Sequence, residues 1–233
     1  MSKHKLIIVA SVCALCLGLW GVVSFRAQVS LASQGPEEVA RQELPEVLRA
    51  VSRLGCEKYG FRDDSELQSA IPGLPYEVYT LSPQAVQSYR SGQRVADLIA
   101  QEQRWEFPVL VNEEARGLLT VAQQEGQWRV VGFGELALSR KVVDLQASFA
   151  NAEVNAGVSP GYSVKLLNVY PIHGTFALIE RGEQELLVYL TSYPGLFEAL
   201  DKMALETYSP EALMPRIVDA LDTVSAGHGE ARP

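Results

Sequence analysis

Residues 104–134 read RWEFPVLVNEEARGLLTVAQQEGQWRVVGFG and carry most of the information on fold class. The stretch holds three runs rich in aliphatic, β-branched and aromatic residues: WEFPVLVN, RGLLTVAQ and QWRVVGFG. Polar turns separate the runs at 112–114 (NEE) and 124–126 (QEG). Because strands joined by turns this short pair antiparallel, the stretch predicts a three-stranded β-meander. Pro108 cannot donate a ladder hydrogen bond and is therefore expected at a strand start or on an edge strand.

Strands are also predicted outside this meander. Residues 76–81 (YEVYTL) have the aromatic and β-branched composition of a single strand. A second β-region follows the Ser-Pro-Gly break at 159–161, with strands expected at 162–170, 175–181 and 185–191. Gly182 can adopt the positive φ of a tight turn between the last two. The second region therefore predicts another antiparallel meander.

Helical periodicity occurs before, between and after the meanders. Five apolar residues lie on one helical face at 44–54, and Gly55 is placed to end that helix. Pro45 fits only a first turn, so this helix is expected to begin near Leu44. Asp63 and Asp64 predict the cap of a short helix that ends before Pro72. Further helices are expected at 83–92, 135–152 and 195–207, and from 209 onward.

This order of elements predicts an α+β fold in which antiparallel β-meanders pack against helices. The fold is preceded by an N-terminal apolar membrane or export helix. Residues 34–223 lack a long linker rich in Pro, Gly or Ser, so we expect one compact unit. Two small lobes, 37–152 and 153–223, are the alternative. Residues 224–233 are expected to form a disordered tail.

The N-terminal segment, residues 1–33, is predicted to be a signal peptide or a membrane anchor with a short tether. Residues 6–25 carry no formal charge, and as a helix they would span about 30 Å. A cleaved signal would be cut after Ala32, whereas an uncleaved anchor would keep its N-terminus in the cytoplasm. Both interpretations place the rest of the chain outside the cytoplasm, on the periplasmic or cell-surface side.

The net charge of −8 combines two unlike parts. Residues 1–33 hold three basic residues and no acidic one, which leaves 17 basic and 28 acidic residues for the rest of the chain, a charge of −11. An acidic domain does not suit the phosphate backbone of nucleic acids, so no nucleic-acid partner is expected. Outside the apolar segment Cys56 is the only cysteine, so the exported part must fold without an internal disulfide.

Familiar catalytic and cofactor motifs are missing from the sequence. It contains no GxxxxGK[ST] phosphate loop, no HExxH or CxxC zinc spacing in the exported part, and no GxSxG nucleophile elbow. We therefore expect no cofactor, no metal and no assigned catalytic residue.

Aromatic residues of the first β-region are the candidate binding residues. Tyr79, Trp105, Phe107 and Trp128 could anchor a recognition surface, although core packing is the better explanation of such residues. His173, in a turn between strands, completes the candidate set. The sharper hypothesis is a groove that receives an extended peptide by edge pairing at the Pro108 strand.

These observations favour an exported, membrane-tethered, non-catalytic domain that binds an envelope protein or peptide. One alternative is an extracytoplasmic, hydrolase-like enzyme whose dispersed residues, Cys56, His173 and the Asp63–Asp64 pair, meet only in the fold. A second alternative is a scaffold subunit that dimerises through its aromatic residues.

Overall fold

The computed structural model describes residues 34–156, 161–192, 197 and 205–227. The predicted apolar segment at 6–25 and most of the predicted helix at 195–207 lie outside these residues. Among the described residues, no helix is both long enough and apolar enough to cross a membrane.

The described strands form one nine-stranded sheet in the order β5-β4-β3-β2-β6-β7-β8-β9, with β1 beside β3. Their bounds are β1 Ile71–Pro72, β2 Tyr76–Leu81, β3 Ile99–Val111, β4 Glu114–Gln124, β5 Gln127–Gly134, β6 Ser163–Val169, β7 Gly174–Arg181, β8 Gln184–Thr191 and β9 Thr207–Tyr208. Both predicted meanders are confirmed, as β3-β4-β5 and β6-β7-β8.

The sheet is mixed, which differs from the purely antiparallel prediction. Strand β2 pairs antiparallel with β3 on one side and parallel with β6 on the other, where Val78 lies opposite Leu166. This one parallel pairing joins the two meanders into a continuous sheet. The α+β class is thus confirmed as helices packed on a large mixed sheet.

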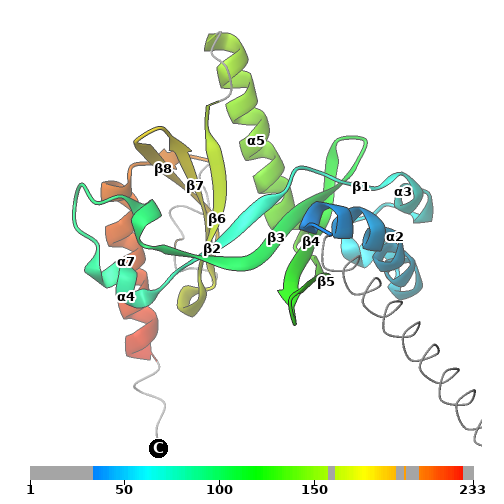
Figure 1. Cartoon of the computed structure of the whole chain (residues 1–233), viewed down its shortest axis with the longest axis horizontal. Coiled ribbons are helices and arrows are strands. Elements are labelled where there is room, and N and C mark those ends of the chain that lie inside the picture. The colour runs from blue at the N-terminus through cyan, green and yellow to red at the C-terminus, as the bar shows by residue number, and fades with distance from the viewer. Residues whose placement is uncertain (1–33, 157–160, 193–196, 198–204, 228–233) are drawn as a thin grey trace, which may run out of the picture.

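The helices within the described residues are distributed along both faces of the sheet. They are α2 Pro36–Leu54, α3 Asp64–Ser69, α4 Pro83–Ser88, α5 Leu136–Ala156 and α7 Pro210–Gly227, with short 3₁₀ turns η1 Cys56–Tyr59, η2 Val95–Asp97 and η3 Tyr170–Ile172. In Figure 1, α2 and α3 lie beside β3–β5 at one end of the molecule, and α4 and α7 lie at the other end.

Three apolar clusters hold these layers together. Leu119 of β4 and Leu167 of β6 contact the clusters under α2 and α7, respectively, whereas their neighbours Leu118 and Leu166 contact the cluster under α5. Because successive strand residues point to opposite faces, α5 covers one face of the sheet, and α2 and α7 cover the two ends of the other face.

Three sequence predictions about element bounds are wrong. Helix α2 begins at Pro36, not near Leu44. Burial of Val39 and Ala40 stabilises the extra turns, although Pro45 interrupts the hydrogen-bond pattern of the helix.

Pro108 lies inside β3, which is paired on both sides. Its missing N–H falls where β2 gives way to β1, between the paired residues Glu106 and Val109, so the ladder loses little. Finally, α7 continues through 224–227, where a tail was expected.

Candidate functional site

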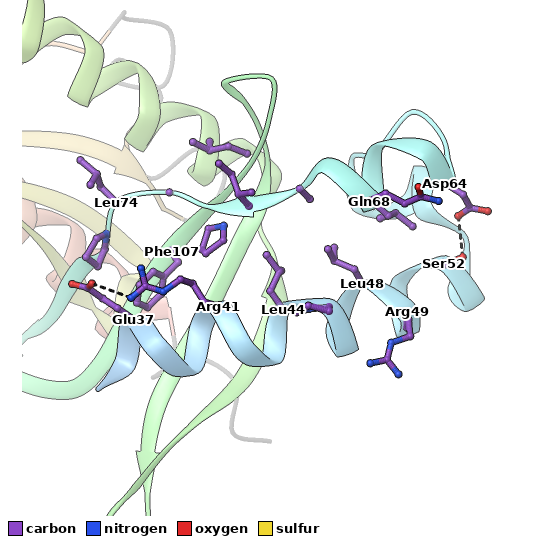
Figure 2. Close-up of a pocket in the computed structure, with 18 of the residues that line it drawn as sticks. Glu37, Arg41, Leu44, Leu48, Arg49, Ser52, Asp64, Gln68, Leu74 and Phe107 are labelled. Carbon is purple, nitrogen blue, oxygen red and sulfur yellow. Dashed lines mark hydrogen bonds and ion pairs between the residues drawn. The ribbon is translucent and has the colours of Figure 1, made fainter. Parts of the chain in front are cut away.

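A groove with a volume of about 1090 Å³ separates α2 from residues 71–75 (Figure 2). Its floor is apolar and includes Leu44 and Leu48 of α2, Leu67 of α3, and Phe107 and Leu110 of β3. We call this feature the α2 groove. It is wide enough and apolar enough to take side chains of a binding partner.

Helix α2 forms one wall because its sequence is amphipathic. The buried residues Leu44, Leu48 and Val51 recur at helical spacing, and they pack into the cluster under α2. Glu43 fixes the helix to the sheet, since its carboxylate accepts a hydrogen bond of 3.1 Å from the backbone N–H of Val130. The α2 wall is therefore rigidly placed over β3–β5.

Residues 71–75 (IPGLP) form the opposite wall. Ile71 and Pro72 pair with β3, and the N–H of Gly73 donates to the carbonyl oxygen of Pro108 at 2.6 Å. Ile71 and Leu74 are each 60% exposed, among the most exposed large apolar residues that the structure describes. We call these two exposed apolar residues the lip of the groove. A lip of this kind beside an apolar floor is the arrangement expected of an interaction site.

Helices α2 and α3 are joined at the far end of the groove. The hydroxyl of Ser52 in α2 donates to Oδ1 of Asp64 at 2.9 Å, as Figure 2 shows. The neighbouring Asp63 caps α3, accepting from the N–H groups of Ser65 and Glu66, so the predicted cap is confirmed. A hydrogen bond from the Ser65 hydroxyl, together with these two N–H bonds, lowers the pKa of Asp63. The two carboxylates serve separate structural contacts and do not face one substrate site.

Charged side chains line the outer rim of the groove. Arg41 lies near Glu37 at 3.9 Å, and Arg49 pairs with Glu46 at 2.8 Å. Each of these pairs is solvent-exposed and contributes little to stability. A partner would therefore meet both positive and negative side chains at the rim, and the rim does not favour a partner of either charge.

A second, smaller depression lies on the α5 face of the sheet, with a volume of about 510 Å³. We call it the polar cleft. Arg104 and Glu106 of β3 line it, together with Glu135, Asn168, Tyr170 and His173. Glu106 is 4% exposed and accepts hydrogen bonds from Nε of Arg104 and from Oγ1 of Thr120, both at 2.9 Å. Burial raises the pKa of Glu106, although Arg104 opposes that shift.

The predicted binding residues do not lie together in the structure. Phe107 lies in the floor of the α2 groove, and Trp105 and Trp128 pack against the same cluster without lining the groove. Tyr79 packs against the cluster under α7, and its hydroxyl donates to Glu77. His173 lines the polar cleft. The proposed edge pairing at the Pro108 strand is excluded, because β3 is an inner strand.

The residues of the enzyme alternative are also separated. Cys56 packs against the cluster under α2, whereas His173 lines the polar cleft. Desolvation and the nearby carboxylates of Asp64 and Glu57 raise the pKa of the Cys56 thiol, which disfavours the reactive thiolate. Within the part of the chain that the structure describes, no group of three or more His, Cys, Asp or Glu residues could hold a metal ion.

Sequence analysis missed the lip of the α2 groove. Ile71 and Leu74 belong to a five-residue segment with two prolines and a glycine, which predicts only a break between elements. The available signal was two large apolar residues inside such a break, because a solvated turn rarely needs them.

Comparisons of the chain with protein-family models, with curated proteins and with solved structures find no match in any of the three.

Proposed function

We propose that the protein is an exported, membrane-tethered, non-catalytic domain that binds an apolar segment of an envelope protein in the α2 groove. The observation that carries this proposal is the apolar floor of the groove together with the exposed lip residues Ile71 and Leu74. Burying such side chains against a partner contributes about 1.5–3 kcal/mol each.

The length of the groove sets the length of its occupant. Helix α2 lines it from Glu37 to Ser52, which corresponds to about 22 Å at the rise of an α-helix. An extended chain covers that distance with about seven residues. A short peptide segment, and not a whole folded partner, therefore matches the groove.

The wall at 71–75 favours recognition through side chains over strand addition. Pro72 and Pro75 lack the N–H groups that a continuous ladder needs. A bound segment must therefore be held chiefly by apolar side chains that enter the groove. In an extended segment alternate side chains point the same way, so every second residue should be apolar.

The position of α2 in the chain supports a partner near the membrane. Only nine residues, 27–35, separate Arg26, at the end of the predicted anchor, from Pro36 at the start of α2. Even fully extended, such a tether reaches about 35 Å. An anchored protein therefore presents its groove to the membrane-proximal segments of its neighbours.

The proposal can be tested with the full-length chain in lipid nanodiscs and a displayed library of random peptides. Peptides that the protein enriches should carry apolar residues at alternate positions. The double variant Ile71→Asp/Leu74→Asp should weaken binding of such a labelled peptide, measured by fluorescence anisotropy, by at least about tenfold.

Leu54→Asp is the matched control, because Leu54 is 57% exposed but lies outside the groove. It should leave binding unchanged. A library without enriched peptides contradicts the proposal, as does equal loss in the control and the double variant. A phospholipid that stays bound in native mass spectra and is not displaced by peptide would identify the groove as a lipid site instead.

A further inference from the structure

A segment of the chain itself has the pattern expected of an occupant of the α2 groove. Residues 27–33 read AQVSLAS, between the predicted anchor and the start of α2, and they lie outside the residues that the structure describes. We call them the tether segment. Ala27, Val29 and Leu31 are apolar residues at alternate positions, and the two residues between them are polar. An extended segment of this sequence would present the three apolar side chains on one side.

The tether segment also matches the groove in length. Its seven residues would cover about 23 Å in an extended conformation, against about 22 Å for the stretch of α2 that lines the groove from Glu37 to Ser52. Val29 and Leu31 would meet a floor of leucine and phenylalanine side chains and the exposed lip of the groove. Burial of these two side chains would supply the favourable free energy of binding.

The absence of charge in this part of the chain suits the groove. Residues 27–35 carry no charged side chain, whereas the residues after 33 have a net charge of −11. The domain would repel an acidic segment but not a neutral one. A neutral segment also enters an apolar groove without burying an unpaired charge.

The contacts of Gln34 favour the tether segment of a second copy over that of the same chain. Nε2 of Gln34 donates to Oε1 of Gln42 at 3.3 Å, and the Gln42 amide in turn donates to Glu38. Neither Gln42 nor Glu38 lines the groove, to which α2 contributes Glu37 and Arg41 instead. A tether segment of the same chain would therefore have to cross over the start of α2 to reach the groove. The tether segment of a neighbouring copy has no such crossing to make.

We propose that the α2 groove binds the tether segment of a second copy of this chain, with Val29 and Leu31 inserted between the floor and the lip. This inference rests on the proposed function, because it names the partner that fills the same groove. Two copies anchored side by side would hold their tether segments at the same height above the membrane as their grooves. Exchange of a segment between identical copies is a low-cost route to dimers.

A labelled peptide tests the binding directly. The peptide acetyl-AQVSLAS-amide should bind to nanodiscs that hold a single copy of the full-length chain, because no second copy is present to fill the groove. Fluorescence anisotropy measures the affinity. A peptide with Val29→Ser and Leu31→Ser should bind at least about tenfold more weakly, since it lacks the two largest apolar side chains. A peptide with Gln28→Ala is the matched control and should bind like the unchanged peptide.

Cross-linking between two copies identifies the source of the segment. The native cysteines at 13, 16 and 56 are first replaced by alanine, and circular dichroism confirms that the protein is folded. One tagged full-length chain then carries Ala32→Cys, and a second chain with a different tag carries Leu74→Cys. Reconstituted together in nanodiscs, they should form a mixed dimer with a bifunctional maleimide. Glu125→Cys, in the exposed turn between β4 and β5, replaces Leu74→Cys as the control and should give little cross-linking.

Each result bears either on the tether segment alone or on the groove as a whole. If apolar library peptides bind and the tether peptide does not, the second-copy assignment is wrong while the proposed function stands. If neither binds, both are wrong. Cross-linking confined to a chain that carries both cysteines would show that the groove holds the tether segment of its own chain, which overturns the assignment to a second copy. Equal yields with Leu74→Cys and Glu125→Cys would overturn it as well.

Discussion

Arg116 of β4 and Glu66 of α3 form a two-point ion pair, with Nε and Nη2 of Arg116 donating to the carboxylate at 2.9 and 2.8 Å. Arg116 is buried, and its Nη2 also donates to Glu114 at 2.8 Å. Because α3 contributes to the α2 groove, this pair positions part of the binding site on the sheet. Hydrogen bonds from Arg116 lower the pKa of Glu66 to about 2.

The Glu66 pair predicts a loss of stability in acid. The pKa of Glu66 in the folded state lies below its ordinary value of 4.5, so the stabilisation is present above pH 4.5 and is lost as the pH falls toward about 2. Denaturant midpoints measured over this range should fall with pH in the wild type. Glu66→Gln should flatten that dependence.

Glu125→Gln serves as the charge control, because Glu125 lies in the exposed turn between β4 and β5. Its effect on the pH dependence should be smaller than that of Glu66→Gln. If both variants flatten the curve equally, the ion pair with Arg116 is not the source of the acid sensitivity.

Phe107→Ala should destabilise the folded protein in the absence of any ligand. Phe107 is 1% exposed and packs in the cluster under α2. Removing a buried phenyl ring lowers the free energy of unfolding by about 3–5 kcal/mol, through lost apolar burial and the cavity left behind. Val131→Ala, at a site that is 43% exposed on β5, should change it by less than about 0.5 kcal/mol. Equal effects in chemical denaturation would contradict the assignment of Phe107 to the core.

Local sequence signals predicted the hairpins well. In the turn at Asn112–Glu113 both residues have positive φ, and in the turn at Glu125–Gly126 the same holds, as two-residue hairpin turns require. Polar residues between two apolar runs indicate such turns without any tertiary information. The same reasoning explains why the strands of both meanders lie within two residues of their predicted bounds, except that β3 begins at Ile99, six residues before the predicted start at Trp105.

Pairings between distant parts of the chain could not be predicted in this way. The parallel contact of β2 with β6 joins residues about 90 positions apart, and no local pattern specifies which strand lies next to an inner strand. The short strand β1 contains a proline and pairs only through Ile71 and Pro72. The α2 groove depends on that strand, so periodicity did not predict its lip, and the two large apolar residues in the Pro-Gly-Pro break were the one local signal.

The buried carboxylate of Glu106 should titrate above the usual range of a glutamate. Burial raises its pKa, and the guanidinium of Arg104 partly offsets that effect. Because a folded-state pKa above the unfolded value favours the protonated folded form, stability should fall as the pH rises through that interval. Carbon-13 NMR of the labelled carboxyl group should report the raised pKa.

Arg104→Met should raise the pKa of Glu106 further, because the variant removes the neighbouring positive charge. Arg129→Met, at an exposed position on β5, provides the control and should leave the Glu106 signal where it is. A lower pKa in Arg104→Met would show that the ion pair does not govern this titration.

Gly60 and Gly92 allow steric crowding to be separated from backbone strain. Both residues have positive φ, at 89° and 81°, so alanine at either position costs about 1–2 kcal/mol in strain. At Gly60 an added Cβ would also lie 2.8 Å from the carbonyl oxygen of Arg116, whereas at Gly92 it meets no atom within 4 Å. Gly60→Ala should therefore lower the free energy of unfolding clearly more than Gly92→Ala in denaturant titrations. Equal losses would mean that the chain at Gly60 moves away from β4 without cost, and that the approach of Gly60 to Arg116 does not help to place α3.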